Sequence, residues 1–154
     1  MSSSLQEFLA TATIKAADAL EKAFLSLPED KRNWKMSESA RSAADQVAEC
    51  AIMNGSTIEM LQSQRFPDEY AQAYYAEEIA RLSQDWNVLQ SLLKANTESV
   101  VEVIRAFPDE TLSAELISPW GPLALTEIVS YPYWNMTYHL GQINYIASVL
   151  KGQE

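Results

Sequence analysis

One stretch near the C-terminus, Tyr131 to Ile146, concentrates the side chains best suited to chemistry. It contains the only histidine of the chain, His139, with Asn135 one helical turn before it and Gln142 about one turn after it. On an α-helix, residues three and four positions apart share a face, so the three side chains should point the same way. An imidazole nitrogen and an amide oxygen can hold a divalent cation together with a further ligand.

A second candidate is Glu49, which sits in an otherwise apolar run between Ala48 and Cys50. A buried carboxylate is costly unless it is paired or bound to a metal. Glu49 therefore either faces solvent, pairs with a cation across the fold, or belongs to a site. Cys50, the only cysteine, has no histidine near it in the sequence and is interpreted as an inert core thiol.

Four amphipathic segments would position these residues. Their apolar side chains recur largely at three- to four-residue spacing, which predicts helices at about 5–27, 43–62, 86–107 and 124–151. Ser42 and Asp45 resemble a capping box at the start of the second segment. Pro132 lies inside the last segment, where it removes one backbone hydrogen bond and predicts a kink just before Asn135.

The connections are of two kinds. The stretch from Phe66 to Tyr75 is aromatic and acidic and is expected to run partly as a short helix along the outside, as a pocket lid, a contact surface or a cover for the core. Residues 108–122 have the proline and glycine content of turns. The sequence therefore predicts an all-α fold, a four-helix bundle, in which Asn135 and His139 could face Glu49.

Composition limits the class further. A chain of 154 residues with 47% apolar residues is enough for a single domain, residues 1–154, with one core. The formal charge of -10 repels phosphate backbones and anionic lipids, so neither nucleic acid nor a membrane is an expected partner. A single cysteine, no leader segment and no apolar run of membrane-spanning length favour a soluble cytoplasmic protein.

The layout, with His139-Leu-Gly-Gln-Ile on the last helix, resembles the DinB/YfiT-like superfamily of four-helix-bundle metalloenzymes. Its members carry a histidine on helix two and a His-x-x-x-His-x-Gly-Gln segment on the last helix, and the three histidines bind a divalent metal such as nickel or zinc. By this resemblance His139 stands at the last histidine and Asn135 at the first of the pair. The run from Ser42 resembles the one that ends in the helix-two histidine, which puts Glu49 at that position.

The resemblance implies a metal site of Glu49, Asn135 and His139, altered from three histidines. An amide oxygen binds borderline metals weakly, and a carboxylate shifts the preference toward ions that favour oxygen ligands, so the affinity for nickel or zinc should fall. The alternative is a direct hydrogen-bonded triad of the same three side chains without a metal.

Three functions follow as hypotheses. Some branches of the superfamily use a thiol activated on the metal, which implies a metal-dependent hydrolase or thiol transferase of unknown substrate, with Glu49 as general base if it does not ligate. The second is a bundle that has lost the metal and binds a small ligand. The third is a non-catalytic homodimer packed through an aromatic surface around Tyr70 to Tyr75 or Trp134.

Overall fold

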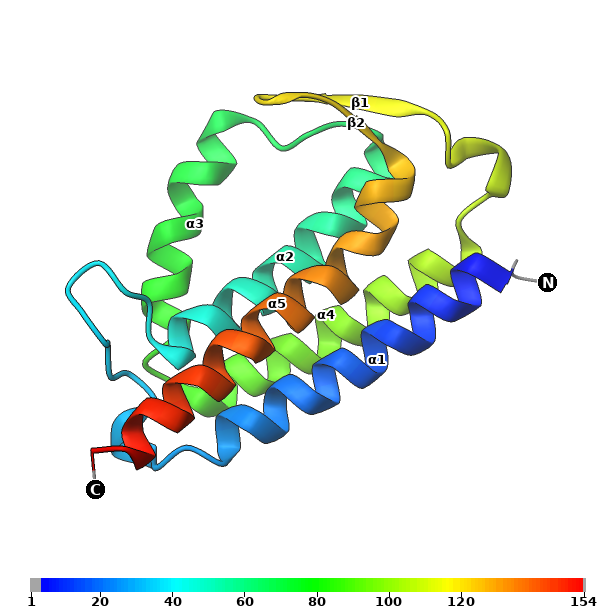
Figure 1. The fold of residues 1–154 in the computed structure, drawn as a ribbon. Helices are drawn as coiled ribbons and strands as arrows, with labels where there is room; N and C mark the ends of the chain where they lie inside the picture. Colours follow the sequence, from blue (N-terminus) through cyan, green and yellow to red (C-terminus); the bar gives the residue numbers. More distant parts are fainter. Residues whose placement is uncertain (1–3, 154) are drawn as a thin grey trace.

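The computed structural model describes residues 4–153, except for the side chains of residues 69–73. Four long helices form a bundle, and a shorter one, α3, stands at its side (Figure 1). The helices are α1 (Ser4–Leu25), α2 (Ala43–Ser63), α3 (Glu69–Leu82), α4 (Trp86–Ala106) and α5 (Leu125–Lys151). The connections contain two 3-10 helices, η1 (Glu29–Lys31) and η2 (Asp109–Thr111), and a hairpin of β1 (Glu115–Ser118) and β2 (Gly121–Ala124). The predicted all-α four-helix bundle is confirmed.

The core of the bundle is formed by all four long helices. α1 and α2 each pack against both α4 and α5 and contact one another much less, so they lie on opposite sides of the bundle. Buried side chains gather in two clusters, one around Leu20 and Val47 and one around Val100 and Ile104. This arrangement sets the first half of α2 against the middle of α5, where the candidate residues lie.

α2 begins where the capping pattern predicts. Ser42 Oγ accepts a hydrogen bond from the Asp45 N–H at 3.0 Å, and Asp45 Oδ2 accepts one from the Ser42 N–H at 3.3 Å. These two bonds satisfy backbone donors that the first turn would otherwise leave without partners. The box therefore fixes the start of the helix and, with it, the face on which Gln46 and Glu49 lie.

The connections depart from the prediction in one respect and extend it in another. Residues 115–124, predicted as turns, pair as an antiparallel hairpin with Leu116 opposite Leu123. Gly121 has a φ of 117°, a conformation that residues with a side chain rarely adopt, and it closes the turn of the hairpin. The helix predicted in part over residues 66–75 is α3, which continues to Leu82 and packs against α2.

α5 passes through Pro132 as one helix, with the proline ring buried. The kink expected at this position is thus not a break, and Asn135 and His139 belong to the same continuous helix. Within residues 4–153, no helix combines the length and the apolar character that crossing a membrane would need.

Replacing Ser42 by alanine should destabilise the fold through the start of α2. The substitution removes the acceptor for the Asp45 N–H, and loss of such a cap typically costs about 1 kcal/mol in the free energy of unfolding. Urea unfolding followed by circular dichroism measures the change. The control is Ser39→Ala in the exposed loop before the helix, which should leave the unfolding curve unchanged; equal curves for both variants would contradict the role of the cap.

Candidate functional site

The central contact of the site joins α2 to α5. His139 Nε2 lies 3.2 Å from Glu49 Oε1, and His139 Nδ1 lies 2.9 Å from Gln46 Oε1. Gln46 and Glu49 are three residues apart and therefore share a face of α2. The imidazole is 3% exposed, so it is held between two polar side chains in the interior of the bundle.

Glu49 has a second partner, Arg41, in the loop just before α2. Arg41 Nη1 donates to Glu49 Oε2, and Arg41 Nη2 donates to the Asp45 carbonyl at 3.3 Å. Burial alone would raise the pKa of Glu49, but the hydrogen bonds from His139 and Arg41 outweigh it, so this pKa is lowered. Of the alternatives left open for Glu49, the structure shows a cation partner, which comes from the preceding loop and not from across the bundle.

The hydrogen bonds of His139 constrain its protonation. Gln46 Nε2 donates to the Arg41 carbonyl at 3.5 Å, which leaves Gln46 Oε1 as the acceptor that faces the ring. His139 Nδ1 must then carry a proton. The other ring nitrogen, Nε2, lies 3.2 Å from the carboxylate of Glu49, so a proton or a cation between these two atoms would make the contact favourable.

Asn135 lies one turn before His139 and is buried, but its amide contacts the neighbour of Glu49. Asn135 Nδ2 lies 3.8 Å from Cys50 Sγ. Burial and the negative charge of Glu49 raise the pKa of the Cys50 thiol, so it stays neutral, as expected of an inert core thiol. The structure thus brings all three predicted site residues to one region, with Glu49 and His139 in direct contact and Asn135 bound to Cys50.

The donors facing each other here suit a divalent metal only in part. In a tetrahedral site with bonds of about 2.0 Å, two ligand atoms lie roughly 3.3 Å apart, close to the separation of His139 Nε2 and Glu49 Oε1. A carbonyl partner on the other ring nitrogen, as Gln46 provides, is also usual for a ligating histidine. Arg41, however, already neutralises Glu49, and in the described part of the chain no three His, Cys, Asp or Glu side chains are grouped for a metal. A tightly bound nickel or zinc ion therefore fits this donor set poorly.

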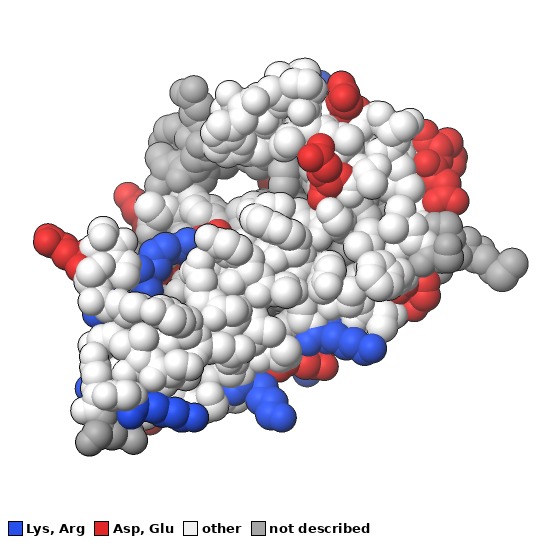
Figure 2. Space-filling view, viewed as in Figure 1, with Lys and Arg blue, Asp and Glu red and all other residues white. Residues whose placement is uncertain are grey.

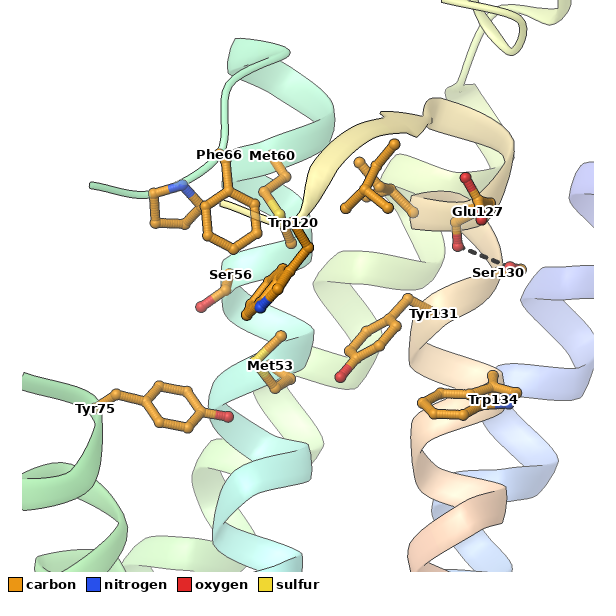
Figure 3. A pocket seen from close by; sticks show the side chains of 13 residues that line it. Met53, Ser56, Met60, Phe66, Tyr75, Trp120, Glu127, Ser130, Tyr131 and Trp134 are labelled. Carbon is orange, nitrogen blue, oxygen red and sulfur yellow. Dashed lines mark hydrogen bonds between the residues drawn. The ribbon is translucent and has the colours of Figure 1, made fainter. Parts of the chain in front are cut away.

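A pocket of about 760 Å³ is lined by residues of α2, α3, α5 and the hairpin, and Figure 2 shows the surface hollowed between the hairpin and the bundle. Its lining is mostly aromatic and apolar: Met53, Ser56, Met60, Phe66, Pro67, Tyr75, Trp120, Leu123, Glu127, Ile128, Ser130, Tyr131 and Trp134. The hydroxyl groups of Tyr75 and Tyr131 point toward one another from α3 and α5 (Figure 3). Burial, followed by the negative charge of Glu49, raises the pKa of both hydroxyls, so both stay protonated.

Sequence reasoning singled out Gln142 but missed two partners of the cluster. Gln142 lines a second hollow of about 440 Å³, with Arg41 and Gln46, and does not complete the contact between Glu49 and His139. Gln46 could have been found, because it lies three residues before Glu49 on the face of α2 that turns inward. Arg41 carried no such signal, since its side chain reaches Glu49 from an irregular loop.

The chain belongs to the DinB superfamily, whose family model matches residues 12–143. Among curated proteins, no significant match was found. The structure is similar to YfiT from Bacillus subtilis, described as a probable metal-dependent hydrolase with an unusual four-helix bundle topology. The two share a TM-score of 0.78 and 12% sequence identity, over 98% of this chain and 90% of YfiT.

Two further solved structures have the same fold. The colibactin self-resistance protein ClbS, in complex with double-stranded DNA, gives a TM-score of 0.71 and 15% identity, over 93% of this chain and 95% of ClbS. A mycothiol-dependent maleylpyruvate isomerase gives a TM-score of 0.68 and 14% identity, over 90% of this chain. The match spans only 60% of the isomerase. At these identities the likeness concerns the fold.

Stability should depend on pH through Glu49. Because its pKa is lowered on folding from its ordinary value of 4.5, the carboxylate contributes stability that is complete above that value and is lost as the pH falls through the folded pKa. The difference in unfolding free energy between wild type and Glu49→Gln should therefore be larger at about pH 7 than at about pH 3. Urea titrations measure it, with exposed Glu98→Gln as the control for one lost charge; a difference independent of pH would contradict this role.

Proposed function

We propose that this DinB-superfamily protein binds a small molecule in the pocket between α2, α3, α5 and the hairpin, and that a hydrogen-bonded cluster replaces the metal of its relatives. The observation that carries the proposal is the set of contacts among Arg41, Gln46, Glu49 and His139. Both carboxylate oxygens and both ring nitrogens already have protein partners. The cluster is therefore complete without an ion.

The pocket supplies the second support. Its volume of about 760 Å³ and its mainly apolar lining, with a few polar groups, are typical of small-molecule sites. Tyr75 and Tyr131 are among its lining residues, so a ligand in the pocket would meet two phenol hydroxyl groups. Two of the similar structures support a role in binding a small molecule, since one is a maleylpyruvate isomerase and the other is a colibactin self-resistance protein.

A second candidate is a metal-dependent hydrolase or thiol transferase with Glu49, Asn135 and His139 as ligands. It is favoured by one observation, the convergence of His139 Nε2 and Glu49 Oε1 at a distance that suits two ligands of one ion. A bound divalent metal such as nickel or zinc would supply a Lewis acid and an activated nucleophile. In that case Asn135 would have to turn its amide oxygen from its place beside Cys50 toward the ion.

Metal binding separates the two candidates. Protein purified without an affinity tag should show no stoichiometric binding when it is titrated calorimetrically with nickel, zinc and manganese. The reason is that Arg41 forms an ion pair with Glu49 and neutralises the carboxylate that a metal would need. The double variant Glu49→His with Asn135→His restores three histidines and should bind nickel or zinc at one ion per chain. Stoichiometric binding by the wild type at comparable affinity would overturn the first proposal in favour of the second.

Ligand binding is tested with a neutral apolar dye. N-phenyl-1-naphthylamine, whose fluorescence rises in apolar surroundings, should bind the wild type and be released by filling the pocket with Ser56→Trp. Ser99→Trp places the same ring on an exposed position of α4 and should leave dye binding unchanged. Dye binding that survives Ser56→Trp would place the ligand elsewhere.

The remaining expectations about location and partners are proposals as well. We expect a cytoplasmic protein without nucleic-acid or membrane partners, on the charge of -10 and the single cysteine. We also expect a homodimer, for which the 55% exposed Trp134 offers a contact; the Tyr70 side chain lies outside the described residues. Sedimentation equilibrium would give twice the mass of 17.3 kDa for a dimer.

A further inference from the structure

We infer that the ligand of the pocket is a lipophilic organic cation, an amine or quaternary onium group carried on apolar substituents. This inference rests on the proposed function, because it names the class of molecule that the same pocket would bind. It follows from three properties of the lining: its aromatic rings, its thioethers and the sign of its charge.

Aromatic rings surround the space from several elements, with Phe66 before α3, Tyr75 on α3, Trp120 in the hairpin turn, and Tyr131 on α5 (Figure 3). The Phe66 and Trp120 rings meet edge to face at a centroid distance of 5.6 Å. Trp120 is 79% exposed, so much of its ring is available to a ligand at the mouth of the pocket. The negative faces of such rings attract organic cations, most strongly where water is excluded.

The sulfur atoms of Met53 and Met60 add polarizable groups that adapt to bulky apolar substituents. Together with Leu123 and Ile128, these two methionines form a part of the lining that has no hydrogen-bond donor in its side chains. A ligand bound there gains from apolar contact, and a diffuse charge on carbon-rich substituents loses less hydration on entry than a compact one does.

The charges of the lining have one sign. Among the described residues that line the pocket, Glu127 is the only charged side chain, and none is a lysine, arginine or histidine. Its Oε2 accepts the Ala124 N–H at 3.0 Å, which holds the carboxylate at the first turn of α5. Arg41, which is not among the described lining residues, is paired with Glu49. Glu127 is exposed at the rim, so an anion that enters the pocket would pass a negative charge with no positive charge among the described lining residues, whereas a cation would be attracted by it.

The test uses two ions of nearly the same shape and opposite charge, tetraphenylphosphonium and tetraphenylborate, as competitors of N-phenyl-1-naphthylamine. The phosphonium should displace the dye at about a tenfold lower concentration than the borate, the ratio that 1.4 kcal/mol of differential binding produces. Glu127→Gln, which can keep the hydrogen bond at the helix start, should remove most of this preference, measured as the ratio of the two displacing concentrations.

The matched control is Glu98→Gln, which removes one negative charge from the exposed face of α4 and should keep the tenfold preference. If both ions compete equally in the wild type, or if both variants lower the preference alike, the inferred ligand class is wrong while the proposed pocket function stands. If the dye itself fails to bind, the proposed function fails and the inference fails with it.

Discussion

A carboxylate taken out of water is the constraint on which this site depends. Moving an unpaired carboxylate into a protein interior costs several kcal/mol, so α2 can pack with Glu49 turned inward only if partners are present. Arg41 comes from the loop before the helix and His139 from α5. Because the two partners arrive from different elements, one side chain joins the loop, α2 and α5. Glu49 thus acts as a junction between three parts of the fold.

The two partners of Glu49 are held in place by the same stretch of backbone. Ser42 and Asp45 fix the first turn of α2, and Arg41 directly precedes that turn. Gln46 links both sides, because it donates to the Arg41 carbonyl and accepts from the imidazole of His139. A change in the loop before α2 would therefore alter the hydrogen bonds of His139, although the loop and His139 are far apart in the sequence.

Features that follow from a local sequence pattern could be predicted, whereas contacts that depend on how two elements pack against each other could not. The apolar spacing of the four long helices and the capping box at Ser42 are local signals, and the structure confirms them. The hairpin escaped notice because strands of four residues with Pro122 inside one of them lack an alternating pattern. The contact of Asn135 with Cys50 depends on the relative rotation of α2 and α5 by a fraction of a turn, which no pattern within either helix encodes.

The junction of β2 and α5 controls how a molecule could enter the pocket. β2 ends at Ala124 and α5 begins at Leu125 with no residue between them. The Leu125 N–H donates to the Ala114 carbonyl at 2.8 Å and the Thr126 N–H to the Leu112 carbonyl at 3.0 Å. These two bonds join the start of α5, which follows β2, to the residues just before β1. Such a junction has no free hinge residue. A ligand of the proposed pocket would therefore meet a hairpin tied to the start of α5, with the 79% exposed indole of Trp120 as a side chain free to rotate at its turn.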